Sequence, residues 1–256
     1  MSFSKIVFIV ICGFFGLTGF SLAVFYYQKA GEALNLSNDL KSQITEYQKK
    51  ESELNSMQKT VEVLYGLSPY EARYYSMIFY DFSKKYEMPW EVYPALVKIE
   101  SCFNSGVLSK EHAKGMTQVL ESTGRHQAEK LGIPFNEGTL WNCVLNMVIG
   151  FDFFSEGYAE CIGSTTQEKA LEHAMKRYCG GPGYNNIKPD AKLYVRKYKS
   201  SLWEEYLRVS YLYKGIKYED LVKSDSLNRL SKPLEVPFNP IAFFEVVKNQ
   251  KLLALK

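Results

Sequence analysis

Charged side chains are absent from one long apolar stretch near the N-terminus, residues 6–27. Its length is close to the about 20 residues that a membrane-spanning helix needs. The pattern predicts a transmembrane anchor. We place residues 1–5 in the cytoplasm, although Lys5 and Lys29 flank the run on both sides and barely decide its orientation. A cleaved signal peptide is the alternative, because Ser21-Leu22-Ala23 is a tolerable cleavage site, but apolar residues continue beyond it to Tyr27 and favour the anchor.

Polar residues dominate the next segment, residues 28–67, and no proline interrupts it. Apolar side chains recur there at a seven-residue spacing, at Leu40, Tyr47, Leu54 and Val61. This spacing predicts a helical stalk with the pattern of a short coiled coil. Gln43 and Lys50 break the pattern, so a single solvated helix or a partly disordered spacer stays open as the alternative.

Residues 68–200 carry apolar side chains at helical spacing, separated by Gly and Pro clusters. Ser68 and Glu71 predict a capping box at a helix start, and we place a domain boundary there. Helices are expected near residues 68–86, 90–100, 119–131, 140–160, 165–177 and 189–213. Because no alternating strand pattern is present, the predicted fold class is mainly α, with a small irregular or β-like loop at residues 109–117.

The last segment, residues 201–256, is a C-terminal extension of unknown role. Pro and Ser residues predict a loop at residues 224–240. Residues 241–255 have the spacing of a short amphipathic helix. We expect that helix to pack on the domain, with docking to a partner or to a membrane surface as the alternatives.

A formal net charge of +3 is too small to indicate a nucleic-acid-binding protein. The three histidines show no metal-binding spacing, so we expect neither a metal nor a cofactor. Four cysteines lie beyond the predicted anchor, at Cys102, Cys143, Cys161 and Cys179. In an exported domain they can pair in three ways, and free thiols are an equal alternative.

An apolar helical run, Ala95 to Ser101, brings one carboxylate, Glu100, to its C-terminal end. A loop of small and polar residues follows at once. An apolar environment disfavours the charged carboxylate, raises its pKa and suits it to general-acid catalysis near neutral pH. On this segment alone, a solvated glutamate at a helix end is the more ordinary interpretation.

The spacing of the motifs from Glu100 onward favours catalysis. These motifs are Glu100-Ser101-x-Phe103-Asn104, then Ser109, Ala113-x-Gly115, Gln118 and Thr123, then Asn146-x-x-x-Gly150, Ala174 to Gly183 with Tyr178, and Tyr194-Val195. In this order and at these separations they resemble the lytic transglycosylase family with a soluble-lytic-transglycosylase (SLT), lysozyme-like domain. The resemblance covers residues 68–200.

The resemblance implies a lysozyme-like helical domain, behind the anchor and stalk, that acts as a peptidoglycan lytic transglycosylase. Such an enzyme cleaves the β-1,4 bond between N-acetylmuramic acid and N-acetylglucosamine without water and leaves a 1,6-anhydromuramyl end. Glu100 is the expected general acid and base, since the muramyl 6-hydroxyl replaces the second carboxylate that most glycosidases use. The alternatives are a hydrolytic muramidase and a non-catalytic peptidoglycan-binding scaffold of an envelope-spanning assembly.

The resemblance also implies a location, which is the bacterial inner membrane with the catalytic domain in the periplasm or cell envelope. The implied partners are peptidoglycan glycan strands, the membrane through the N-terminal helix, and envelope or secretion-machinery proteins. Nucleic acid is not among them.

Individual residues receive roles from the same resemblance. Those expected to bind the glycan are Ser109, Gly115, Met116, Gln118, Thr123 and Tyr178. Tyr178 is expected to hydrogen-bond or orient the Glu100 carboxyl, while Asn146 and Gly150 are expected to be structural. Without the resemblance, the polar residues of this set would be interpreted as turn, brace, cap and core residues.

The sequence departs from the family pattern in several places. The departures are His112 for Gly, Thr117 for Met, Glu121 for Pro, and Cys179-Gly180 for Asn-Ala. Glu100 and Tyr178 are retained, so a loss of activity is not indicated. We expect the departures to affect substrate preference and loop geometry.

Overall fold

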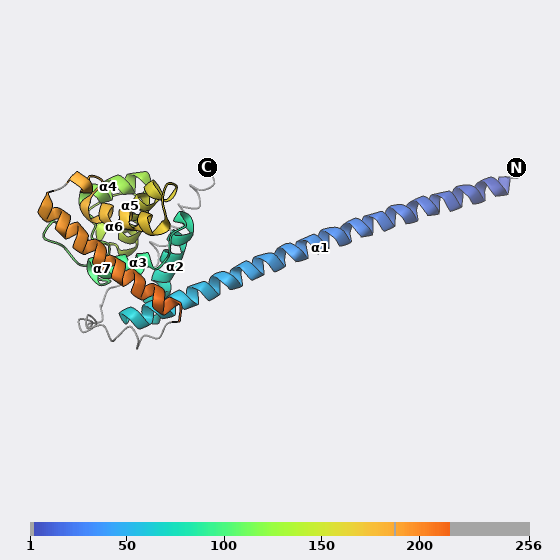
Figure 1. Cartoon of the computed structure of the whole chain (residues 1–256). Coiled ribbons are helices and arrows are strands. Elements are labelled where there is room, and N and C mark those ends of the chain that lie inside the picture. The colour runs from blue at the N-terminus through green and yellow to red at the C-terminus, as the bar shows by residue number, and fades with distance from the viewer. Residues whose placement is uncertain (1–2, 187, 216–256) are drawn as a thin grey trace. The chain divides into compact units, whose positions relative to one another are not determined.

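The described chain begins with a long helix, α1 (Phe3–Tyr65), in the computed structural model (Figure 1). The structure describes the backbone of residues 3–186 and 188–215, and the side chains of residue 25, residues 27–186 and residues 188–215. No helix in this part of the chain is long and apolar enough to cross a membrane. The side chains of the predicted anchor, residues 6–27, lie outside the described ones except for Phe25 and Tyr27.

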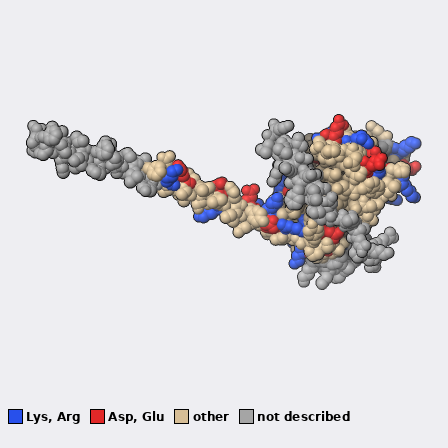
Figure 2. Space-filling view, turned by 180° about the vertical axis from the view of Figure 1, so that it is seen from behind, with Lys and Arg blue, Asp and Glu red and all other residues tan. Residues whose placement is uncertain are grey.

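The chain divides into two compact units, Met1–Glu53 and Leu54–Lys256. In the first unit, Leu40 and Tyr47 are exposed, and charged side chains of both signs accompany them along the helix (Figure 2). Leu54 and Val61 continue the same seven-residue series but are buried in the core of the second unit. The first two residues of the series are therefore exposed and the last two are part of a hydrophobic core. Coiled-coil pairing of the exposed half stays a prediction.

The second unit is built from helices, which confirms the prediction of a mainly α fold. After α1 come α2 (Pro69–Tyr86), α3 (Val92–Ser101), α4 (Glu121–Lys130), η1 (Thr139–Trp141), α5 (Cys143–Ile162), α6 (Gln167–Gly180), η2 (Tyr184–Asn186) and α7 (Pro189–Tyr213). Helix α5 packs against α2, α4 and α6, and α7 packs against α3 and α6. The predicted C-terminal loop and amphipathic helix lie outside the described residues.

Two local predictions are confirmed. The Ser68 side chain accepts a hydrogen bond from the Glu71 amide, and the Glu71 carboxylate accepts one from the Ser68 amide, which completes the capping box of α2. In the loop between α3 and α4, isolated antiparallel bridges join Lys114 to Leu108 and to Val119. This is the β-like loop expected from the sequence.

Helix α3 is fixed by a buried aromatic residue, Tyr93. Its ring lies 4.8 Å from the Phe151 ring of α5 and 5.9 Å from the Phe82 ring of α2, measured between centroids. Its hydroxyl forms a hydrogen bond of 3.1 Å with Ser155 of α5. Since packed interiors resist displacement, these contacts hold the first turn of α3 at a defined place beside α5.

Candidate active site

Glu100 lies in the last turn of α3, and its carboxyl accepts a hydrogen bond from the Tyr198 hydroxyl of α7. Part of the residue reaches solvent, but burial of the carboxyl raises its pKa from 4.5 to about 7, while the hydrogen bond from Tyr198 acts in the lowering direction. The prediction of an acid with a raised pKa is therefore confirmed. A carboxyl with this pKa exchanges a proton readily near neutral pH.

The turn after Glu100 has an unusual backbone. Cys102 and Phe103 both adopt left-handed conformations, with φ of 54° and 64°, and such residues cost about 1–3 kcal/mol each. The Phe103 ring offsets this cost by packing 4.8 Å from the Tyr65 ring and 5.9 Å from the Tyr75 ring. The aromatic cluster thereby fixes the point at which the chain leaves α3.

The loop between α3 and α4 is braced by a buried amide, Asn146 of α5. Its Oδ1 accepts hydrogen bonds from the Thr117 amide and hydroxyl, each 2.8 Å long. Its Nδ2 donates to the carbonyls of Lys114 and Leu140 at 2.8 and 3.0 Å. The Ser101 hydroxyl donates to the Met116 carbonyl at 2.7 Å, so this loop is also tied to the end of α3. Asn146 has the structural role that was expected.

Gly150 permits a close approach between α5, α6 and the loop. A Cβ atom at this position would lie 2.1 Å from Thr117 Oγ1 and 3.0 Å from the Tyr178 hydroxyl. That hydroxyl, from α6, donates to the Thr117 carbonyl at 2.6 Å. Any larger residue at position 150 would push these groups apart, which supports the expected close-contact role of Gly150.

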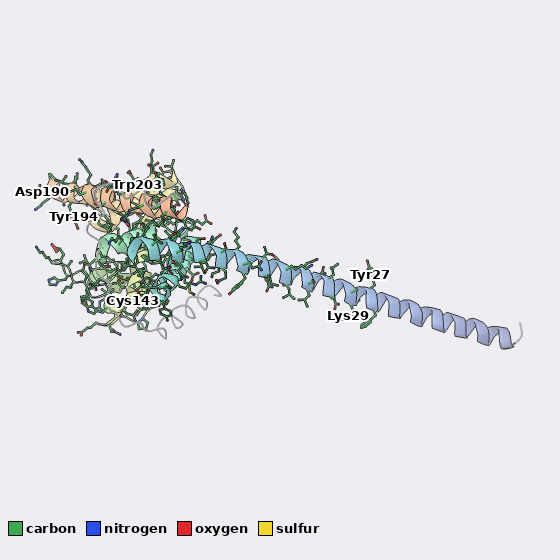
Figure 3. The ribbon with its side chains drawn as sticks, turned by 90° about the horizontal axis from the view of Figure 1, so that it is seen from below. Tyr27, Lys29, Cys143, Asp190, Tyr194 and Trp203 are labelled. Atoms are coloured by element: carbon green, nitrogen blue, oxygen red, sulfur yellow. The ribbon has the colours of Figure 1, made fainter. Side chains whose placement is uncertain are left out.

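The Tyr178 hydroxyl donates to the Thr117 carbonyl and not to Glu100, whose hydrogen bond comes from Tyr198. The alternative role of Tyr178, orienting the carboxyl, stays a prediction. Tyr198 lies one helical turn after Tyr194, the residue at which the sequence motif was recognised. Because residues four apart in a helix lie on neighbouring turns, this spacing could have indicated Tyr198 as a second candidate partner of Glu100. Tyr194 lies near the start of α7, close to Asp190 and away from Trp203 (Figure 3).

Two predicted glycan contacts are buried inside the protein. The Met116 side chain has no exposed surface, and its expected part in letting the loop approach the glycan closely stays a prediction. Gly115 is also buried, and a Cβ there would lie 2.4 Å from both Asn146 Nδ2 and the Leu140 carbonyl oxygen. Gly115 therefore shapes the loop from within, because its close packing against Asn146 leaves no room for a side chain.

Three further predicted contacts lie on or beside the same loop. The Ser109 hydroxyl accepts hydrogen bonds from the amides of Glu111 and Ala113 at 3.2 and 3.0 Å. The Gln118 side-chain amide donates to the carbonyls of Val107 and Gly115 at 3.1 and 3.0 Å. Thr123 lies in the first turn of α4, three residues after the N-cap Leu120. Glycan contact by Ser109, Gln118, Thr123 and Tyr178 stays a prediction.

The departures from the family pattern have local explanations. His112 has φ of 62°, the left-handed conformation that glycine adopts without strain. The Thr117 hydroxyl binds Asn146 directly. Glu121 begins α4 and pairs with Lys114 at 3.0 Å. Burial, together with the nearby Glu100 charge, raises the pKa of Cys179 to about 12, so its thiol stays protonated.

The four cysteines from Cys102 to Cys179 are free thiols in the structure. Among the described side chains, no group of three or more His, Cys, Asp or Glu residues is arranged to hold a metal ion.

Residues 77–200 match the family model of the Transglycosylase SLT domain. No curated protein matches the chain. The matched segment runs from the middle of α2 into α7 and contains Glu100, Tyr178 and Tyr198. The resemblance inferred from the sequence motifs is confirmed.

Proposed function

Because residues 77–200 belong to the Transglycosylase SLT domain family, we propose that this protein is a peptidoglycan lytic transglycosylase with a lysozyme-like catalytic domain and Glu100 as its general acid and base. The observation that carries the proposal is the environment of Glu100. Burial raises the pKa of its carboxyl to about 7, and Tyr198 holds that carboxyl by a hydrogen bond. The ideal pKa of a group that both donates and accepts a proton lies near the working pH.

The reaction uses this one carboxyl twice. The protonated Glu100 donates its proton to the oxygen that links N-acetylmuramic acid to N-acetylglucosamine, and the bond from the muramyl C1 to that oxygen breaks. The Glu100 carboxylate then accepts the proton of the muramyl 6-hydroxyl, whose oxygen forms a new bond to C1. The products are a free N-acetylglucosamine end and a 1,6-anhydromuramyl end. Glu100 recovers its proton, and no water is consumed.

The proposal includes a membrane anchor at residues 6–27 and a catalytic domain in the periplasm or cell envelope of a bacterium. Its support is the absence of charge from residues 6–27 and the helical backbone of α1 over that range. Peptidoglycan glycan strands are the proposed substrate. Membrane lipid and proteins of an envelope or secretion assembly are the proposed partners.

The test is the product formed from isolated peptidoglycan sacculi. The full-length protein should release muropeptides with anhydro ends, which mass spectrometry separates from reducing ends by one water. Glu100→Gln should abolish release while the protein stays folded. Glu111→Gln is the matched control, because Glu111 is an exposed carboxylate on the neighbouring loop, and it should retain release.

Two outcomes would contradict the proposal. Reducing ends in place of anhydro ends would identify a hydrolytic muramidase. Binding to sacculi with no release by the parent protein would identify a peptidoglycan-binding scaffold.

A further inference from the structure

The last residue of α1, Tyr65, contacts three segments that surround Glu100. Its ring lies 4.8 Å from the ring of Phe103, in the turn that follows α3. The Lys98 ammonium of α3 lies 6.0 Å from the centre of the Tyr65 ring. The Tyr65 hydroxyl oxygen is buried beside the Glu205 carboxylate of α7. One side chain therefore joins the end of α3, the turn after it and α7.

Two of these contacts bear directly on the place of Glu100. Phe103 follows Glu100 by three residues and has a left-handed φ of 64°, a conformation that persists only where the surroundings enforce it. Glu205 lies two helical turns after Tyr198, and both are buried on the same side of α7. A displacement of Phe103 would move the backbone next to Glu100, and a displacement of α7 would move the hydroxyl that donates to its carboxyl.

The polar end of Tyr65 lies against a fixed carboxylate. Glu205 is only 8% exposed, and its carboxylate accepts a hydrogen bond of 3.1 Å from Arg208. Burial, and then the Glu205 charge, raises the pKa of Tyr65 well above 10, while Arg208 acts in the lowering direction. Tyr65 therefore keeps its proton at neutral pH and is able to donate it to Glu205 in a hydrogen bond.

This contact is made by parts of the chain outside the matched family segment. The match covers residues 77–200, so Tyr65 precedes it and Glu205 follows it. Val61 and Leu64, which precede Tyr65 on α1, are buried in the core of the same compact unit. The end of α1 is therefore part of the packing around the candidate active site.

We propose that Tyr65 is a positioning residue for the reaction proposed above: its ring holds the turn at Phe103, its hydroxyl holds α7 at Glu205, and together these contacts fix the Glu100 carboxyl against the glycan. This inference rests on the proposed function. It gives the end of the predicted stalk a part in catalysis that is exerted through other residues. Small movements matter here, because a misplacement of about 1 Å can cost about 100-fold in rate.

The decisive variant is Tyr65→Leu in the full-length protein, which removes both the ring and the hydroxyl. The kcat for release of anhydro ends should fall about 10-fold or more, with KM nearly unchanged, because Glu100 loses its orientation while glycan contacts are kept. Tyr65→Phe keeps the ring contact with Phe103, so its kcat should lie between those of Tyr65→Leu and the parent.

Leu54→Ala is the matched control, because Leu54 is a buried residue of the same helix about 16 Å from Tyr65 along its axis. It should lower the midpoint of the tryptophan fluorescence melting curve and leave kcat unchanged at temperatures where the protein is folded. Leu54→Val gives the same comparison with a smaller loss of stability. An unchanged kcat in Tyr65→Leu, or equal losses of kcat in Tyr65→Leu and Leu54→Ala, would overturn the inference.

A second readout separates this inference from the proposed function. In protein labelled with ¹³C at glutamate carboxyls, the Glu100 signal is assigned by its loss in Glu100→Gln. Loosening of the turn and of α7 admits water to the carboxyl, so its pKa should fall from about 7 toward 4.5 in Tyr65→Leu and stay in place in Leu54→Ala.

The groups around Glu100 leave this titration easy to interpret. Burial raises the pKa of each of the other titratable groups that interact with it, so all of them are uncharged at neutral pH: Tyr178, Cys179, Tyr194 and Tyr198. An unmoved Glu100 titration in Tyr65→Leu overturns the role of Tyr65, whatever the product is. Reducing ends released by the parent overturn the proposed function alone.

Discussion

Replacement of Glu100 by Gln should stabilise the protein above neutral pH. Burial raises the pKa of this carboxyl from 4.5 to about 7, so the folded protein holds the Glu100 proton more tightly than the unfolded chain does. Between these pH values folding takes up a proton, and each rise in pH therefore lowers the free energy of unfolding. At about 1.4 kcal/mol for each pH unit, the charged form costs about 3 kcal/mol above pH 7.

The amide of Glu100→Gln has no charge to bury and can still accept the hydrogen bond from Tyr198. We expect parent and variant to differ little near pH 4, where the parent carboxyl is protonated in both states. The variant should become the more stable protein as the pH rises, by about 3 kcal/mol at pH 8. The substitution expected to stabilise the protein is also the one expected to abolish the proposed activity, a combination typical of an active site that holds a disfavoured charge.

Urea denaturation of the full-length protein at several pH values measures this difference. The three tryptophans, Trp90, Trp141 and Trp203, all lie in the second compact unit, so their fluorescence reports its unfolding. Glu111→Gln is the control, and its difference from the parent should stay flat. If the advantage of Glu100→Gln does not grow between pH 5 and pH 8, the carboxyl is not desolvated and the argument for its acid–base role fails.

The remaining predictions concern the scaffold of the site. Gly150→Ala should destabilise the protein by about 1–3 kcal/mol or more, since the added Cβ would lie 2.1 Å from the Thr117 hydroxyl oxygen. Gly163→Ala is the control and should change stability by less than about 0.5 kcal/mol, because a Cβ there would have no atom within 4 Å. Equal effects in urea denaturation would refute the close contact. His112→Gly should be neutral or stabilising by up to about 1 kcal/mol, because it relieves a left-handed φ of 62° at some cost in chain entropy; a clear loss of stability would show that the imidazole is needed. A chain that begins at Ser68 should lose the cooperative thermal transition, measured by circular dichroism, that a chain beginning at Gln48 keeps. The shorter chain lacks four buried side chains, Leu54, Met57, Val61 and Leu64, whose burial contributes about 1.5–3 kcal/mol each. A sharp thermal transition in the shorter chain would refute the assignment of these four residues to the core.

Local features of this protein could be predicted from local sequence. The capping box at Ser68 depends on residues three apart, and the raised pKa of Glu100 follows from the apolar helix that carries it. The partner of Glu100 could not be predicted, because Tyr198 lies 98 residues further along the chain and the register between α3 and α7 is set by tertiary packing.

The seven-residue series on α1 shows a second limit. A helix that pairs with another helix and a helix that packs on a globular core both place apolar residues at this spacing. The sequence suggested one stalk that ends before Ser68, but Leu54 and Val61 belong to the core of the second unit. Only the position of the neighbouring helices distinguishes the two cases.

The order in which the ribosome makes these helices has a consequence for the cell. Glu100 emerges early, on α3, but the hydroxyl that holds its carboxyl arrives on α7, the last helix of the described domain. A chain that ends before α7 lacks both this hydrogen bond and the packing of α7 on α3. We therefore expect the surroundings of Glu100 to be complete only when the last helix of the described domain has been made.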